Sequence, residues 1–103
     1  MDNGYAILER DWHYQRRDLD IIASKDGMLV IVEVRTRSNI NYLQPEESVD
    51  YHKIRSISIA ANAYVKGHRV NASLRFDIIA VTGSPGAKYH INHIPDAFYP
   101  PAR

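Results

Sequence analysis

Two short apolar segments joined by an Asp-Gly turn are the feature that most constrains the fold of this chain. Leu19 to Ala23 is apolar except for Asp20, and Met28 to Val34 is apolar up to Glu33. Strands that are covered on both faces have this composition. Between the segments, Asp26 and Gly27 supply the positive φ angles of a two-residue hairpin turn. The sequence therefore predicts an antiparallel hairpin near the centre of a β-sheet.

Three further segments have the pattern of strands. Residues 5–12 mix aromatic, branched and charged residues, Leu74 to Val81 is apolar, and Tyr89 to Ile94 alternates after a cluster of turn residues. We expect the last of these at an edge of the sheet.

Apolar residues recur at helical spacing between residues 51 and 66. The apolar stripe comprises Ile54, Ile57, Ala60, Ala61, Tyr64 and Val65, and the opposite face comprises Arg55, Ser58, Asn62 and Lys66. We predict a helix from Tyr51 to Lys66, with Asp50 as its N-cap and Gly67 as its C-terminal stop. A right-handed crossover through this helix sets the strands before and after it parallel. The predicted fold is therefore α/β with a mixed central sheet.

The length of 103 residues fits one domain, which we assign to residues 1–94, with residues 95–103 as an extended proline-rich tail. The hydrophobic share of 45% is that of an ordinary soluble protein, and no apolar run approaches the roughly 20 residues that span a bilayer. We expect a cytoplasmic protein without membrane contact. Because the chain lacks cysteine, any metal must have oxygen or imidazole ligands. The net charge of +1 does not by itself indicate a nucleic-acid partner.

The predicted hairpin brings acidic residues together. Counting from the turn places Asp20 opposite Glu33 and Asp18 opposite Arg35, all on one face. Directly opposed side chains have Cβ atoms about 4.5 to 5.5 Å apart, so two carboxylates repel unless a cation lies between them. Mg²⁺ is held in proteins by one or two carboxylates, with water and substrate phosphate as further ligands. We predict that Asp20 and Glu33 hold Mg²⁺ or Mn²⁺.

Arg35 lies two residues beyond Glu33, on the same face, where its planar guanidinium can bind phosphate. A phosphodiester between the metal and Arg35 would be open to attack by a metal-activated water, which is hydrolytic chemistry. A structural interpretation stays open, because acids within apolar strands commonly pair with arginines or backbone amides. The arginines available for such pairs include Arg16 and Arg17.

Other titratable residues give weaker patterns. The five histidines are scattered over predicted turns, a helix start and an edge strand. His90 and His93 are an odd number of positions apart, so they would point to opposite faces of a strand. Asp77 lies in an apolar strand, where we expect it to be a partner for Arg75 or Lys53. We therefore place these residues outside the metal site.

The segments of the hairpin also resemble a known family. Residues 17–23 (RDLDIIA) followed by 31–37 (IVEVRTR) resemble the YraN-type family of uncharacterised bacterial proteins. Residues 45–50 leading to Lys53, and residues 75–81, resemble later blocks of that family in the same order. The family is regarded as a branch of the restriction-endonuclease-like superfamily, whose fold is a mixed sheet flanked by helices and whose motif is Asp, then Glu-x-Lys. The resemblance implies a restriction-endonuclease-like domain.

Carried over position by position, the resemblance makes Asp20 and Glu33 metal ligands, adds the backbone carbonyl of Val34, and puts Arg35 where the motif lysine stands. Arginine binds phosphate but stays protonated, so it cannot accept a proton from water as a neutral lysine would. Asp18 stands where the family has glutamate, and we expect it to contact Arg35. The family also starts with a helix whose glutamate can join the site, and we expect that helix to be missing from this chain.

Two hypotheses of function follow. The first is a metal-dependent nuclease that hydrolyses DNA phosphodiesters, with branched or structured DNA among its candidate substrates. The residues expected to hold the DNA backbone are Arg37, Lys53 and Arg55. The second is a catalytically inactive module of the same fold that binds DNA or another protein. The exposed edge strand at residues 89–94 would allow a homodimer.

Overall fold

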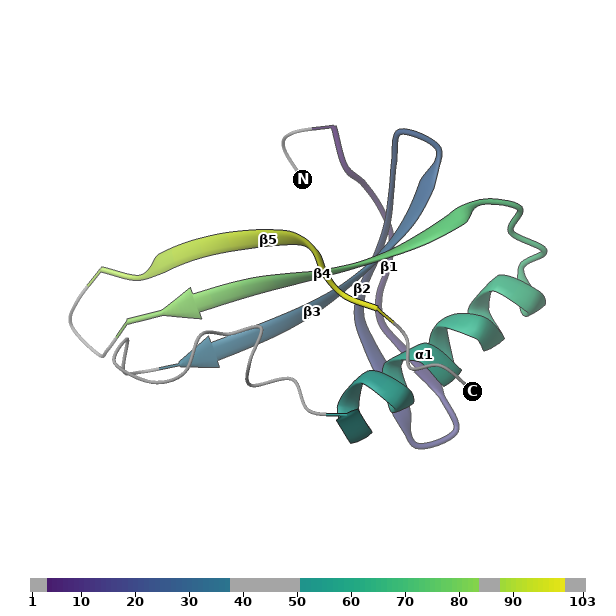
Figure 1. Ribbon diagram of the computed structural model, residues 1–103, viewed down its shortest axis with the longest axis horizontal. Coiled ribbons are helices and arrows are strands. Elements are labelled where there is room, and N and C mark those ends of the chain that lie inside the picture. The colour runs from purple at the N-terminus through teal and green to yellow at the C-terminus, as the bar shows by residue number, and fades with distance from the viewer. Residues whose placement is uncertain (1–3, 38–50, 84–87, 100–103) are drawn as a thin grey trace.

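A computed structural model describes residues 4–37, 51–83 and 88–99 of the chain. A five-stranded sheet in the order β1-β2-β3-β4-β5 has a helix along one of its faces (Figure 1). The elements, in chain order, are β1 (Ala6–Tyr14), β2 (Arg17–Lys25), β3 (Met28–Arg37), α1 (Tyr51–Gly67), β4 (Ser73–Thr82) and β5 (His90–Phe98). Within the described ranges, no helix is long and apolar enough to span a membrane.

The β2–β3 hairpin forms as its turn residues predict. Asp26 and Gly27 have φ angles of 51° and 77°, as a type I′ turn requires. The pairing places Ile22 opposite Ile31, which is the predicted register. Beyond the hairpin, β3 and β4 pair in parallel, and α1 lies between them in the chain. The predicted mixed α/β sheet is confirmed.

The sheet buries apolar side chains on both of its faces. The cluster on the face toward α1 comprises Leu19, Ile22, Leu29, Ile31 and Phe76 of the sheet and Ile57, Ala60, Ala61 and Tyr64 of α1. The smaller cluster on the opposite face comprises Tyr5, Ala23, Val30 and Val32. Because β2 and β3 contribute to both clusters, their paired segments at residues 21–23 and 28–32 are wholly apolar.

The C-terminus of α1 is built differently from the prediction. Gly67 is the last helical residue, and Arg69, with a φ of 53°, takes the left-handed conformation that the sequence assigned to glycine. The amide of Val70 donates to the carbonyl oxygen of Val65 at 3.0 Å, and the amide of Arg69 donates to that of Lys66 at 3.4 Å. These two bonds are the Schellman pattern, which satisfies the last carbonyl groups of a helix.

Ser58 corrects the polar face predicted for α1. The residue is buried, and its hydroxyl donates to the carbonyl oxygen of Ile54 at 2.8 Å. A hydroxyl that bonds back to the preceding turn leaves no unpaired donor, so serine can join the buried stripe. The predicted N-cap, Asp50, lies outside the described residues.

β5 is the predicted edge strand, but it continues through Pro95 as far as Phe98. Residues 95–98 of the expected tail therefore belong to the sheet. The β4–β5 register shifts in this stretch, where Asp96 has a φ of 54°. Edge strands and bulges tolerate proline because a ladder hydrogen bond is not required there. The ring of Phe98 then stacks on Phe76, with centroids 5.3 Å apart, and packs against the core.

Candidate active site

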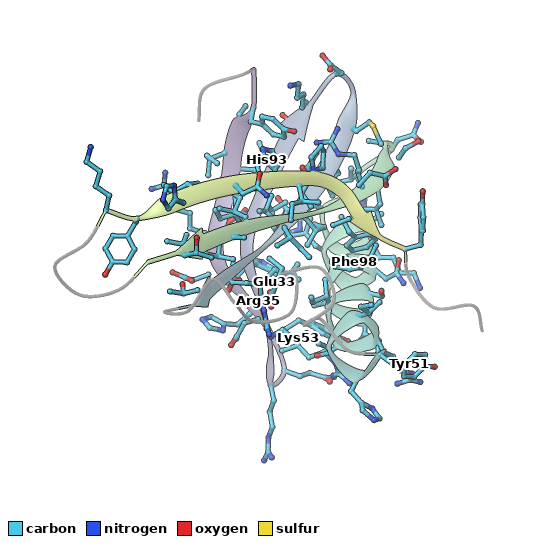
Figure 2. All side chains as sticks on the ribbon, turned by 60° about the vertical axis from the view of Figure 1, so that its left-hand side comes forward. Glu33, Arg35, Tyr51, Lys53, His93 and Phe98 are labelled. Atoms are coloured by element: carbon cyan, nitrogen blue, oxygen red, sulfur yellow. The ribbon has the colours of Figure 1, made fainter. Side chains whose placement is uncertain are left out.

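A cluster of charged side chains surrounds Glu33 on the face of the sheet toward α1. Alternation along β3 puts Glu33 on the same face as Ile31, which packs against the helix. The Glu33 side chain is only 5% exposed, and its Oε2 lies 3.4 Å from Arg35 Nη1. Lys53, in the first turn of α1, places Nζ 3.5 Å from the same oxygen. Figure 2 shows Glu33, Arg35 and Lys53 side by side.

Asp20 joins this cluster from β2, although not through the strand pairing that the sequence predicts. The β2–β3 register ends at the pair Ile21 and Val32. Beyond that pair, Asp20 Oδ2 accepts a hydrogen bond from the Val34 amide at 2.9 Å. A side-chain carboxylate thus takes the role of a backbone acceptor, and the register predicted for Asp20 and Glu33 does not extend this far.

β2 departs from regular alternation near Asp20. Leu19 and Ile22 are three residues apart, yet both pack in the cluster against α1, while Ile21 packs on the opposite face. Regular alternation puts residues at odd spacing on opposite faces. A register counted from the turn therefore fails once it passes this irregular stretch.

The pKa of Glu33 is raised above its ordinary value, first by burial and then by the negative charge of Asp20 and the hydrogen bond between the two acids. Lys53 and Arg35 lower the pKa, but their effect is the smaller one. The positive charge of Lys53 and Arg35 therefore does not fully compensate the two acids. Either a proton or a further cation would stabilise this cluster.

The donors present fit a hard divalent cation. Proteins usually contribute one or two carboxylates to a Mg²⁺ shell, and water and substrate oxygens complete it. In residues 4–37, 51–83 and 88–99, no three His, Cys, Asp or Glu side chains gather into a metal site. The side-chain ligands would therefore be Asp20 and Glu33. The role predicted for the Val34 carbonyl stays a prediction, and the amide of Val34 is what holds Asp20 in place.

The other predicted residues lie at different distances from this cluster. Asp18, expected to contact Arg35, instead has its Oδ1 2.5 Å from His13 Nδ1 on the exposed surface. The β1–β2 ladder pairs these two residues, whereas the β2–β3 ladder has already ended at this level. Arg55 is exposed on α1, and Arg37 ends β3 with its side chain outside the described part.

Lys53 is a residue of the cluster whose position the sequence analysis missed. The sequence placed it on the DNA backbone, whereas the structure brings its ammonium group to Glu33. The available signal was the order of elements alone, because Lys53 lies in the first turn of the crossover helix that follows β3. Spacing along the chain alone does not show which residues meet across this connection.

Asp77 lies on the face of the sheet opposite Glu33 and belongs to a separate network. It is fully buried and accepts hydrogen bonds from Arg75 Nε at 2.8 Å, Arg75 Nη2 at 2.7 Å and the Asp96 amide at 3.0 Å. His93 Nε2 lies 2.7 Å from the same carboxylate, and the Tyr5 hydroxyl bonds to both Asp77 and Arg75. The predicted pairing of Asp77 with Arg75 is confirmed.

Hydrogen bonds outweigh burial in setting the charge of Asp77. Burial by itself raises the pKa of this carboxyl, but the bonds from Arg75, the Asp96 amide and His93 lower it below its ordinary value. The sequence placed His93 only on an edge strand, and its place in this network was missed. The β4–β5 register pairs His93 with Ile79, two residues from Asp77 and on the same face, which the sequence could not supply without that register.

Comparison with known proteins shows that the sequence is similar to one family. The family described as "Uncharacterised protein family UPF0102" matches residues 1–81. A UPF0102 protein of Bacteroides thetaiotaomicron is 49% identical over 100 residues, which are 97% of this chain and 82% of the relative. A UPF0102 protein of Clostridium beijerinckii is 43% identical over 98 residues, which are 93% of this chain and 80% of the relative. The names of these relatives state no activity.

Proposed function

The chain belongs to the uncharacterised protein family UPF0102, as its resemblance to an uncharacterised bacterial family indicated, and we propose that it is a metal-dependent nuclease acting on DNA phosphodiesters. One observation carries this proposal. Two carboxylates, Asp20 and the buried Glu33, meet where the pKa of Glu33 stays raised despite two neighbouring cations. A carboxyl group perturbed in this way beside a second acid is typical of metal and catalytic sites, although structural networks share it.

Each residue of the cluster would have a separate role in the proposed reaction. Asp20 and Glu33 would hold Mg²⁺ or Mn²⁺, which when bound polarises a phosphoryl oxygen and lowers the pKa of water. Arg35, which is 21% exposed, would donate to the phosphate and stabilise the negative charge that develops on it. Its permanent charge suits this role and excludes it from accepting a proton.

Lys53 would take over the role that the motif lysine has in the superfamily that the resemblance implies. The motif position itself is occupied by Arg35, so the sequence alone leaves the site without a lysine. Lys53 Nζ lies 3.5 Å from Glu33 Oε2 while its side chain is 44% exposed, so the ammonium group faces both the acid and the solvent. There it would hold the attacking water by donating a hydrogen bond.

A second function, a nuclease fold that binds DNA without cutting it, is favoured by the bonds that the acids already make. Asp20 accepts the Val34 amide, and Glu33 pairs with Arg35 and Lys53. Such bonds would satisfy two structural acids in the absence of metal. In that case Arg35, Lys53 and Arg55 would serve to bind the phosphate backbone.

One set of measurements separates the two functions. Binding of Mg²⁺ and Mn²⁺ is measured by calorimetry, and DNA binding and cleavage are both assayed on duplex, branched and single-stranded DNA. We expect the wild type to bind metal and to cut at least one of these substrates, and Asp20→Asn and Glu33→Gln to lose both properties. Asp26→Asn is the matched control, because it removes an exposed acid of the same hairpin and keeps a residue that type I′ turns favour.

Each outcome decides between the two functions. A wild type that binds DNA but neither binds metal nor cuts would establish the second function. A wild type that does none of the three would overturn both functions. Equal losses in Asp26→Asn and in Asp20→Asn would show that the effect comes from charge in general rather than from this cluster.

A further inference from the structure

A pocket with basic side chains opens between the turn of the β1–β2 hairpin and α1. Gln15, Arg16 and Arg17 line it from the hairpin, and Ser56 lines it from the helix. Its volume of about 440 Å³ falls within the range of small-ligand sites, roughly 300 to 1,000 Å³. Because none of these lining residues is acidic, two guanidinium groups determine the charge of the pocket.

Arg17 has a hydrogen-bond donor that the described residues leave unsatisfied. Its Nε is buried and has no partner within residues 4–37, 51–83 and 88–99, whereas its Nη1 donates to Gln15 Oε1 at 3.1 Å. Because the Gln15 amide oxygen accepts this bond, the NH₂ group of Gln15 is left to donate elsewhere. The pocket therefore combines several donors with two positive charges.

A two-residue turn closes the β1–β2 hairpin beside the pocket. Gln15 has a φ of 58° and lies directly after the Tyr14–Arg17 pair opens into the turn. Two-residue hairpin turns require a positive φ of this kind. Here the conformation accompanies a contact between the Gln15 amide and Arg17, one of the two arginines of the pocket.

We propose that Gln15, Arg16, Arg17 and Ser56 bind one phosphate group and that, if the proposed function holds, this group is a backbone phosphate of the bound DNA. Arginine binds phosphate through paired N–H donors, and phosphate oxygens would accept hydrogen bonds from the guanidinium groups of Arg16 and Arg17. A phosphate carries the negative charge that two arginines attract when no acid lines the pocket with them. Neutral sugars or apolar ligands would leave that charge uncompensated.

The position of the pocket connects it to the Glu33 cluster. Ser56 lies three residues after Lys53 on α1, and Arg17 lies three residues before Asp20 on β2. These spacings correspond to about 5 Å along a helix and about 10 Å along a strand. A DNA strand advances about 3.4 Å along its axis per phosphate, so the pocket would hold a phosphate roughly one to three nucleotides from the bond that is cut.

Titration of the full chain with inorganic phosphate tests the pocket itself. In NMR spectra of ¹⁵N-labelled protein, we expect saturable shifts of the Arg17 Nε–H signal and of the amides of Arg16 and Ser56. The double variant Arg16→Gln/Arg17→Gln should weaken phosphate binding by about tenfold or more, because charge-assisted hydrogen bonds are lost. Shifts that do not saturate would overturn the proposal.

The matched control is Arg10→Gln/Lys66→Gln, which removes the same charge from exposed positions that do not line the pocket. We expect this control to bind phosphate as the wild type does, and an equal loss in both double variants would overturn the proposal. Should Arg16→Gln/Arg17→Gln fail to fold, Arg17→Lys takes its place. It keeps the charge and loses the fork of the guanidinium, so phosphate binding should fall severalfold.

Binding of duplex DNA at several salt concentrations tests the source of the phosphate. Loss of one phosphate contact in Arg16→Gln/Arg17→Gln should reduce the slope of log affinity against log salt by about 0.9. Saturable phosphate binding with an unchanged DNA slope would assign the pocket to a free phosphate-bearing ligand and overturn its part in DNA binding.

The phosphate titration and the DNA measurements test the pocket separately from the proposed function. A chain that cuts DNA but gives no saturable phosphate shifts would overturn the pocket and leave the nuclease standing. A chain whose pocket binds phosphate but which neither binds nor cuts DNA would support the pocket and overturn the nuclease.

Discussion

The Asp20 carboxylate accepts a hydrogen bond from the Val34 amide at 2.9 Å, at a level where the β2–β3 register has already ended. Because Val34 follows Glu33 directly in β3, this bond holds Asp20 beside Glu33. The two acids are coupled as a result: after burial, the charge of Asp20 is the largest cause of the raised pKa of Glu33. A proton and the ammonium group of Lys53 therefore compete for one carboxylate, and the proposed metal ion would compete with both.

The coupling predicts opposite shifts in the pKa of Glu33 for two variants. Asp20→Asn removes a negative neighbour and should lower that pKa, while Lys53→Gln removes a positive neighbour and should raise it. Asparagine can still accept the Val34 amide hydrogen, so the geometry is preserved. The measurement is NMR titration of the Glu33 side-chain carboxyl carbon in metal-free protein. An unchanged pKa in Asp20→Asn would contradict the coupling.

Glu33 should reduce stability when it is ionised. Since its folded-state pKa is raised above 4.5, its contribution to stability is fully present below that pH and is lost as the pH rises through the folded-state pKa. At neutral pH and without metal, Glu33→Gln should therefore shift the urea midpoint upward. Asp26→Asn, an exposed control, should stay within about 0.5 kcal/mol of the wild type. A urea midpoint for Glu33→Gln below that of the wild type would show that ionised Glu33 stabilises the fold.

Lys53 should matter to cleavage where another lysine of the same helix does not. Lys53→Ala removes the ammonium group 3.5 Å from Glu33, and we expect cleavage to slow by about 10²-fold, as when one donor at a reacting centre is lost. Lys66→Ala, in the last turn of α1, removes the same charge and should leave the rate nearly unchanged. Single-turnover rates at saturating metal measure both, and equal rates would exclude the role assigned to Lys53.

Asp77 should matter to stability and not to metal binding. Asp77→Ala leaves Arg75 and His93 without their buried partner and should destabilise the protein by about 3 to 5 kcal/mol. The lowered pKa of Asp77 means that its contribution is present above 3.8 and is lost as the pH falls through the folded-state pKa. Urea unfolding measures the loss, and calorimetry measures metal binding. If Asp77→Ala folds but no longer binds metal, the two faces of the sheet are not independent, and the prediction is wrong.

Phe98 should contribute to the fold although it lies in the segment expected as a tail. Its ring stacks on Phe76, so Phe98→Ala should cost about 1 to 3 kcal/mol of unfolding free energy. The neighbouring Tyr99 is 72% exposed, and Tyr99→Ala should change stability by less than about 0.5 kcal/mol. Thermal or urea unfolding of the two variants is the measurement. Similar losses would show that the end of β5 does not pack as described.

Interactions between residues close in sequence could be predicted well. The Asp-Gly pair sets the β2–β3 hairpin, and alternation sets its register as far as Ile21 and Val32. The helical stripe gave the bounds of α1 to within one residue, and the order of elements gave the parallel pairing of β3 with β4. These features depend on local backbone preferences and on the handedness of one connection.

By itself, the sequence determined which acids stand in the hairpin, that the sheet is mixed, and that an arginine, Arg35, follows two residues after Glu33. Only the tertiary structure decided that Asp20 reaches the site through the Val34 amide, that Lys53 lies against Glu33, and that His93 lies with Asp77 on the opposite face. The physical reason is that these contacts join residues 14 to 20 positions apart, on different elements. These contacts depend on where the pairing of β2 and β3 ends and on how α1 packs against the sheet. Local backbone preferences do not specify either.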